Sequence, residues 1–174
     1  MRGLVQSQVA RIILCAGLLL FLVLVVLPLG SKGNLGHVAL RNVCLRNVKV
    51  MGLGCLMYSE DYDNRFPLTA RWMDDLQGYV KSEATLHCPS FSHPLGNSKE
   101  ALAKVPYGYA MNRFLSGSNA VKLAEPHEKP LIYESIELGR DVSGFLTDVP
   151  NPGRHGGSNE FAFADGHARS MKGS

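Results

Sequence analysis

The stretch RHGGSNEFAFADGH, residues Arg154–His167, decides the fold of the C-terminal part of this 174-residue chain. Within it, Glu160–Ala164 alternates bulky and small side chains, and Asp165-Gly166 is a dipeptide that tolerates positive φ; His167–Met171 then continues the chain. Alternation followed by Asp-Gly is typical of a β-hairpin with a two-residue turn. We therefore expect two antiparallel strands, joined at Asp165-Gly166, to close the domain.

A long amphipathic helix is predicted well before this hairpin, over Leu35–Ser59. Its apolar stripe spans about 80° at helical pitch and consists of Leu40, Cys44, Val48, Met51, Cys55 and Tyr58. The acidic segment that starts at Glu60 is unfavourable at a helix C-terminus and ends the helix. Gly52 and Gly54 weaken it, so we expect them to permit the close approach of a strand or loop.

The segments between helix and hairpin predict one more short helix and a few strands. Ala70–Val80 reads as the short helix, and Leu131–Ser135 is the best interior strand. Pro106–Asn112 and Phe145-Leu146 are further extended segments. Helix first and strands later predicts an α+β fold, with helices on one face of a small antiparallel sheet.

An apolar run of eighteen residues, Ile12–Leu29, lies near the N-terminus. As a helix it would span ~27 Å, close to the ~30 Å hydrocarbon core, so it predicts a transmembrane helix. A cleaved secretory signal is the competing interpretation, with Ser31-Lys32-Gly33 as a poor but possible cleavage site. The apolar regions of such signals are usually shorter than this run. The expected domains are an anchor over 1–30, a joint over 31–34 and a head over 35–174.

Charge divides the chain into two parts. Residues 1–49 contain six Lys/Arg and no acid, whereas residues 50–174 contain twelve Lys/Arg and fifteen Asp/Glu. A basic stretch beside a bilayer predicts contact with anionic lipid headgroups. The rest of the chain lacks basic clusters interleaved with aromatic residues, so nucleic acid is not an expected partner.

Three cysteines lie in the expected head, and Cys15 lies in the apolar run. Outside the cytoplasm, one disulfide and one spare thiol are expected. Cys44 and Cys55 are about 16 Å apart along a helix, too far to bond each other. Cys88 is then the partner of one of them.

Three segments together resemble a family of bacterial pilin-like proteins that carry a C-terminal His-x9-Asp-Gly domain. The segments are Cys44–Pro67, Trp72–Ser90 with its Cys-Pro-Ser, and Tyr107–Asn112 followed by the final motif His155, Asp165 and Gly166. The resemblance implies a pilin-like or pseudopilin-like envelope protein, with a long helix across a C-terminal sheet. It also implies a Cys44–Cys88 disulfide and a cytoplasmic N-terminus, although the charges flanking the apolar run favour the opposite orientation.

The N-terminus departs from the family pattern. Gly3-Leu4 stands where such precursors are cleaved, but Gln8 replaces the glutamate that pairs with a neighbouring subunit. A neutral Gln cannot form that ion pair, which leaves both processing and polymerisation open.

Candidate chemistry is sparse. His155, Asp165 and His167 are possible metal ligands, but Asp-Gly is already explained as a turn and His155 as a hydrogen-bonding residue that fixes a loop. The oxygens of Glu60–Asn64 do not have EF-hand spacing. Cys88 and Ser90 match no nucleophile signature. We therefore expect no enzyme, cofactor, metal or small-molecule substrate.

The expected function is structural. The chain is predicted to be a single-pass inner-membrane protein with an extracytoplasmic head, serving a type II secretion or pilus-like assembly through contacts with itself or other pilin-like subunits. The alternative is a tethered, non-assembling module that binds an envelope ligand through the loops between Pro89 and Gly144.

Overall fold

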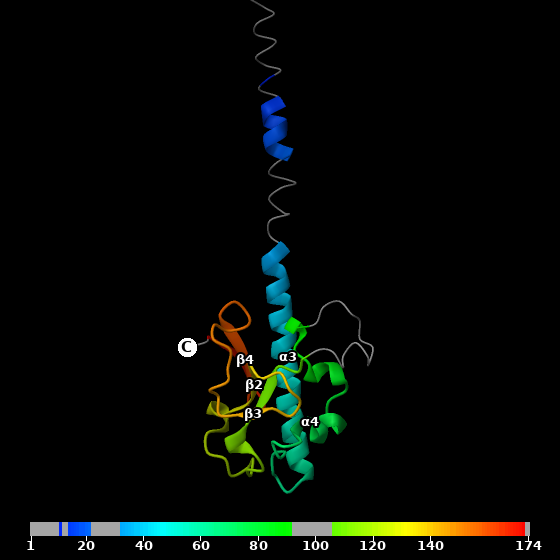
Figure 1. Cartoon of the computed structure of the whole chain (residues 1–174), viewed down its shortest axis with the longest axis vertical. Coiled ribbons are helices and arrows are strands. Elements are labelled where there is room, and N and C mark those ends of the chain that lie inside the picture. Colours follow the sequence, from blue (N-terminus) through cyan, green and yellow to red (C-terminus); the bar gives the residue numbers. More distant parts are fainter. Residues whose placement is uncertain (1–10, 12–13, 22–31, 92–105, 173–174) are drawn as a thin grey trace, which may run out of the picture. The chain divides into compact units, whose positions relative to one another are not determined.

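The computed structural model describes residues 11, 14–21, 32–91 and 106–172, with side chains from residue 38 onward in the long helix (Figure 1). The chain divides into two compact units, Met1–Val38 and Ala39–Ser174. Of the expected joint at 31–34, residues 32–34 already belong to the long helix, whereas residue 31 and the Gly3-Leu4 cleavage site lie outside the described residues. The second unit contains the sheet and the buried core.

The long helix α3 extends over Lys32–Asp61, a few residues beyond the predicted Leu35–Ser59 at each end. Four members of the predicted stripe are completely buried, which confirms the face assignment: Cys44, Val48, Met51 and Cys55. Leu40 and Tyr58 at the two ends of the stripe are half-buried. The helix is therefore held by the burial of one face.

A second stripe on α3 points to solvent. Its members follow one another at spacings of three and four residues, which places them on one side of a helix, opposite the buried stripe. They are Arg46, Lys49, Leu53, Met57 and Glu60, all exposed. Two of them are apolar, since Leu53 is 42% and Met57 is 50% exposed.

Five strands form one sheet in the order β3-β1-β2-β4-β5. Their bounds are Tyr109–Asn112 for β1, Pro130–Glu134 for β2, Ser143–Gly144 for β3, Ser158–Phe163 for β4 and Ala168–Lys172 for β5. Three pairings are antiparallel, but β1 and β3 pair in parallel. The expectation of a purely antiparallel sheet is therefore corrected: the chain returns to the edge of the sheet by a longer crossover after β2.

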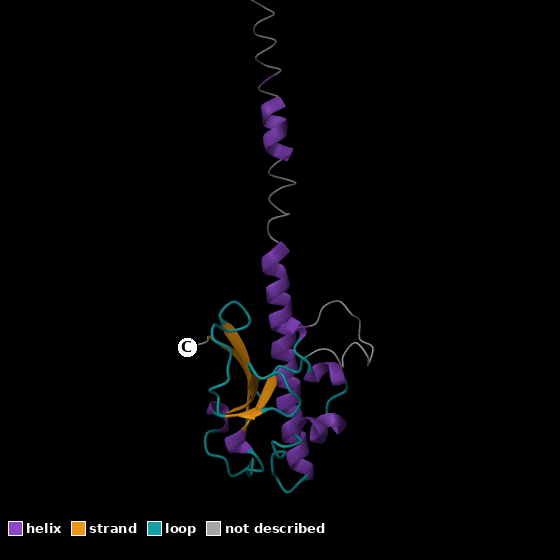
Figure 2. Ribbon diagram, in the orientation of Figure 1, coloured by secondary structure: helices purple, strands orange, loops and turns teal. Residues whose placement is uncertain are grey.

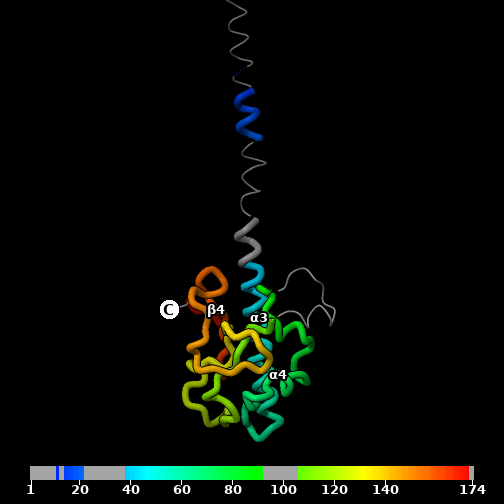
Figure 3. Tube along the Cα trace, viewed as in Figure 1, coloured from blue at the N-terminus to red at the C-terminus, as the bar shows by residue number. Residues whose placement is uncertain are grey.

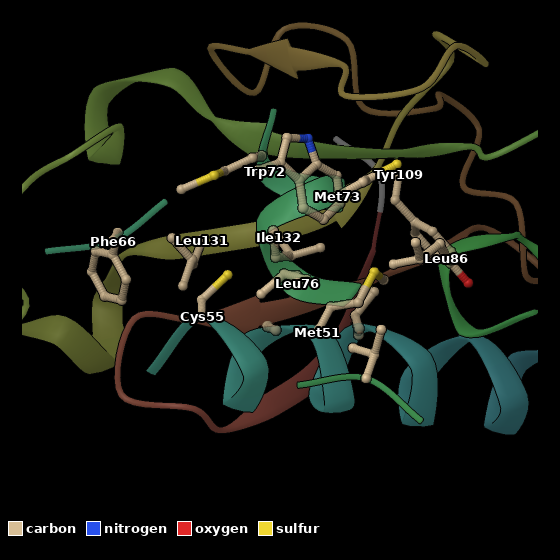
Figure 4. Close-up of a cluster of buried hydrophobic side chains, with 14 of the residues drawn as sticks. Met51, Cys55, Phe66, Trp72, Met73, Leu76, Leu86, Tyr109, Leu131 and Ile132 are labelled. Carbon is tan, nitrogen blue, oxygen red and sulfur yellow. The ribbon is translucent and has the colours of Figure 1, made fainter. Parts of the chain in front are cut away.

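The buried face of α3 lies on one face of this sheet (Figure 2). A Cβ on Gly52 would stand 2.8 Å from the Cβ of Ala162 on β4, so glycine is what permits this close approach. The prediction for Gly52 is confirmed. In Figure 4, Met51 and Cys55 point from the helix into a cluster completed by Trp72, Leu76 and Ile132.

The opposite face of the sheet carries its own smaller core. Ala110, Tyr133, Phe161 and Phe163 alternate with the helix-facing residues of their strands and are buried. The segment around Val142–Val149 packs against them. Both faces are thus covered, one by α3 and the other by a loop rather than by a helix (Figure 3).

The predicted helix Ala70–Val80 is shorter and broken. α4 covers only Trp72–Asp75 and continues as the 3₁₀ turn η2, Leu76–Gly78. No side chain caps the start of α4, and Gly78 ends the turn that follows it, so the helix is short. The remaining 3₁₀ turns are η3 Glu83–Leu86, η4 Pro89–Phe91, η5 Arg113–Leu115 and η6 Pro126–Glu128.

The predicted C-terminal hairpin is present as β4 and β5, but its turn differs. The Gly166 N–H donates to the Phe163 carbonyl and the Phe163 N–H donates to the His167 carbonyl, each at 2.9 Å. Only Gly166 has positive φ (+85°). The connection is therefore a longer turn ending in a left-handed glycine, because β4 stops at Phe163.

The expected transmembrane helix is corrected as well. Across the described residues, no helix is both long enough and apolar enough to cross a membrane. The described part of the apolar run is the helical segment 14–21, which at 1.5 Å per residue covers only about 12 Å. α3 has the length but carries Arg41, Arg46 and Lys49. The rest of Ile12–Leu29 lies outside the described residues.

Candidate functional site

A buried cluster of polar side chains lies between α3 and the sheet. Cys44 comes from α3, Cys88 from the turn between η3 and η4, and Glu134 from the end of β2, all with no exposed surface. Arg154 and His155 come from the loop before β4. Four segments that are distant in sequence thus meet at one point, which we call the Cys–His–Glu cluster.

The two sulfur atoms are neighbours. Cys44 Sγ lies 3.6 Å from Cys88 Sγ, and both residues carry free thiols. Cys55, by contrast, lies three turns further along α3 among apolar side chains, where burial raises the pKa of its thiol. The structure therefore brings together the two cysteines that the resemblance pairs, whereas a disulfide between them stays a prediction.

Glu134 is the centre of the cluster. One carboxylate oxygen, Oε1, lies 2.9 Å from His155 Nε2 and 3.9 Å from Cys88 Sγ. The other, Oε2, accepts a 3.0 Å hydrogen bond from the Glu160 backbone N–H on the adjacent strand β4. Because a buried carboxylate needs such partners, the side chain is held in one orientation by the sheet itself.

Arg154 supplies positive charge. Its Nη1 lies 3.5 Å from Cys88 Sγ and 3.6 Å from Glu134 Oε1, and it donates to the Gly108 carbonyl at 3.1 Å. The guanidinium also lies over the ring of Phe91, 4.6 Å from the centroid. Arg154 therefore links the cysteine turn to the sheet.

These contacts shift the acid–base equilibria of the cluster. The hydrogen bond from Cys44 lowers the pKa of Cys88 to about 6, against a burial effect that raises it, and Arg154 adds to the lowering. The same sulfur pair and burial raise the pKa of Cys44, which holds its proton. Burial alone would lower the pKa of His155, but the Glu134 carboxylate outweighs it and the pKa is raised.

A second buried acid lies beside the first. Glu160 on β4 has no exposed side-chain surface, and burial raises its pKa. Its Oε2 accepts a 2.5 Å hydrogen bond from Ser170, while Oε1 has Arg41 Nε at 3.7 Å. Glu160 thus ties β4 both to β5 and to α3.

Asn159 and Asn47 hold the surrounding segments. The amide of Asn159 donates to the Pro150 carbonyl at 2.7 Å, and its oxygen accepts from the Arg154 N–H at 3.0 Å. Asn47, one turn after Cys44, donates to the His87 carbonyl at 3.3 Å, next to Cys88. Both amides are buried, so the loops that carry Arg154, His155 and Cys88 are fixed to β4 and α3.

The His-x9-Asp-Gly motif does not form one site. The His155 side chain bonds to Glu134, across to β2, while its backbone N–H donates to the Ser158 carbonyl at the start of β4. Asp165 instead accepts from the His167 backbone N–H at 3.1 Å and lies 2.6 Å from His167 Nδ1, which together outweigh burial and lower the pKa of Asp165. Asp165-Gly166 is a turn, and His155 belongs to the Cys–His–Glu cluster.

The hypothesis of a metal held by His155, Asp165 and His167 is thus replaced by a different set. Within the described part of the chain, the one group of at least three potential ligands is Cys44, Glu134 and His155, whose donor atoms lie within 4.8 Å of one another. The acids after α3 do not gather in this way, and Asp61 accepts a hydrogen bond from the Tyr79 hydroxyl at 2.7 Å.

Sequence reasoning missed Glu134, Arg154 and Glu160. A usable signal was present for the first acid, because Glu134 ends the apolar strand Pro130–Glu134 two residues after the inward-facing Ile132. An acid in phase with the core face of a strand indicates a buried polar partner. Nothing local indicated that Arg154 would reach Cys88.

Comparisons with known protein families, with curated proteins and with solved structures found no match.

Proposed function

We propose that this chain is a pilin- or pseudopilin-like structural subunit, working in an extracytoplasmic type II secretion or pilus-like assembly. The resemblance over Cys44–Pro67, Trp72–Ser90 and the final motif motivates the class. The fold agrees with what that class requires, because a long N-terminal helix packs across a sheet made by the C-terminal strands.

The observation that carries the proposal is the outer stripe of α3: Arg46, Lys49, Leu53, Met57 and Glu60. The buried stripe supplies the contacts that hold the helix to the sheet, and the outer stripe adds to them at Leu53, whose side chain lies beside Gly166 in the turn between β4 and β5. It nevertheless keeps Leu53 and Met57 exposed between charged residues. An exposed apolar strip with a polar rim is the pattern of a protein–protein contact.

The buried polar residues favour a structural over an enzymatic function. Glu134, Asn159 and His155 are buried, and each is hydrogen-bonded to neighbouring backbone or side chains. A catalytic site needs convergent groups that a substrate can reach. These residues instead join β2, β4 and the loop before β4, which suits a rigid structural subunit.

The test measures the molar mass of the full-length protein by light scattering, after mild extraction of the protein from its cells. The wild type is expected to be an oligomer, and Met57→Glu is expected to shift it toward the monomer. Val121→Glu is the matched control, because Val121 is 76% exposed in a loop. A wild type that stays monomeric at every concentration would sink the assembly proposal and favour the tethered binding module.

A further inference from the structure

The donor atoms of the Cys–His–Glu cluster are of the types that bind zinc. Two thiols, one imidazole and one carboxylate converge from Cys44, Cys88, His155 and Glu134. Sulfur and imidazole nitrogen select zinc-like ions over calcium or magnesium, which prefer oxygen alone. This set of donors is independent of the proposed assembly function.

Cys44, Glu134 and His155 have donor atoms within 4.8 Å of one another, and Cys88 adjoins this group through Cys44 and Glu134. Three of the donor–donor distances lie near the edges of a tetrahedron around one small ion. Zinc bonds of about 2.3 Å to sulfur and about 2.0 Å to nitrogen or oxygen imply S···S edges of about 3.8 Å and S···O edges of about 3.5 Å. The structure has 3.6 Å between the two sulfurs and 3.9 Å between Cys88 Sγ and Glu134 Oε1. His155 Nε2 and Glu134 Oε1, now 2.9 Å apart, would separate by about 0.4 Å to reach the N···O edge of about 3.3 Å.

The surroundings satisfy the further needs of such a site. Two thiolates, one carboxylate and a divalent ion sum to one negative charge, which Arg154 beside Cys88 and Glu134 neutralises. The second oxygen of Glu134 is already oriented by the Glu160 N–H. Such outer contacts hold first ligands in place at metal sites.

We propose that Cys44, Cys88, Glu134 and His155 form a buried zinc site that fastens α3 to the sheet. Binding releases the thiol proton of Cys44 and the proton that lies between His155 and Glu134, and it replaces that hydrogen bond with two metal bonds. No electron transfer is involved. The site competes with a Cys44–Cys88 disulfide, which would require the sulfurs to close from 3.6 Å to about 2.05 Å.

The test uses the reduced full chain, titrated with Co²⁺ and then with Zn²⁺. Tetrahedral thiolate ligation gives intense visible bands and a near-ultraviolet thiolate-to-cobalt band, both of which zinc should abolish at one equivalent. Cys44→Ser and Glu134→Gln are expected to weaken binding at least about tenfold. Cys55→Ser is the matched control, since Cys55 is equally buried on the same helix and outside the cluster.

Two readouts keep the test decisive if a variant fails to fold. One equivalent of zinc should raise the melting temperature of the reduced wild type, and metal analysis should find about one ion per chain. Absence of the bands in folded, reduced wild type would overturn the proposal. Bands that remain unchanged in Cys44→Ser would also overturn it. A third contradicting result would be a Cys44–Cys88 disulfide and no bound metal in the native protein, found by intact-mass measurement and peptide mapping.

Discussion

Gly52 is the residue on which the helix–sheet contact most directly depends. Alanine there would place its Cβ 2.8 Å from that of Ala162, so overpacking should outweigh the gain of about 1 kcal/mol in helix propensity. We predict that Gly52→Ala lowers the free energy of unfolding by about 1–2 kcal/mol in urea denaturation. Gly78→Ala is the control, because a Cβ at Gly78 would meet open space within 4 Å; equal losses for both would contradict the close approach.

Asp165 should contribute stability that depends on pH. Its pKa in the folded protein is lowered from 3.8, so the ionised form is favoured by folding. The contribution is complete above the ordinary pKa and is lost as pH falls through the lowered one. We predict that Asp165→Asn is less stable than wild type from neutral pH down to about pH 5, and that the difference shrinks below about pH 4.

Denaturation curves of both proteins across this pH range would check the Asp165 prediction. A difference that stays constant down to about pH 2 would show that the turn does not depend on the carboxylate charge.

At the scale of single residues, the sequence predicted positions whose role depends on the local backbone. Gly52 read as a site of close approach, and Gly166 read as a turn glycine, because glycine is the residue that both conditions require. The partners of His155 could not be predicted in the same way. Its contact with Glu134 depends on how two strands align, which no local pattern specifies.

At the scale of elements, the loop before β4 depends on Asn159. Its buried side chain donates to the Pro150 carbonyl and accepts from the Arg154 N–H, which is partly buried. We predict that Asn159→Ala costs about 1–3 kcal/mol, because one buried and one partly buried backbone group lose their partner. Hydrogen exchange should rise over Arg154–Ser158 more than over β1.

Asn159→Asp separates the two bonds made by this side chain. The carboxylate keeps the acceptor for the Arg154 N–H but loses the donor to Pro150. Intermediate exchange in this variant is expected, whereas exchange equal to wild type in both variants would show that the loop is held by other contacts.

Strong local patterns predicted elements well, and weak ones did not. Pro130–Glu134 lies within one residue of the predicted Leu131–Ser135, because a run of apolar and β-branched residues favours a strand wherever it packs. Ala70–Val80 was overpredicted, since its few apolar residues also suit a short helix with a 3₁₀ turn. Strand β3, only two residues long, carries too little pattern to be placed from sequence.

At the scale of the whole molecule, the combination of one long helix with a C-terminal sheet followed from the order of the elements. The mixed strand order and the loop that covers the second sheet face did not. Both depend on pairing between segments far apart in the chain. The buried cluster belongs to the same category, because its residues come from α3, the cysteine turn, β2 and the loop before β4.

The packing of the whole domain should depend on the buried stripe rather than on the outer one. We predict that Met51→Ala costs about 2–5 kcal/mol, as expected for a fully buried side chain. Met57→Ala, on the same helix but half exposed, should change the free energy of unfolding by about 0.5 kcal/mol or less. Thermal unfolding of the two variants would check this contrast, and similar losses would contradict the assignment of the two faces.

The central claim is that the outer stripe of α3 contacts other subunits, and photo-crosslinking in the native cells tests it most directly. A photoreactive amino acid at Arg46 or Met57 is predicted to give adducts with further copies of this chain or with another pilin-like protein, identified by mass spectrometry. The same probe at the exposed Val121 should give none of these adducts. Probes on α3 that yield only uncrosslinked monomer, or adducts no different from those at Val121, would contradict the account.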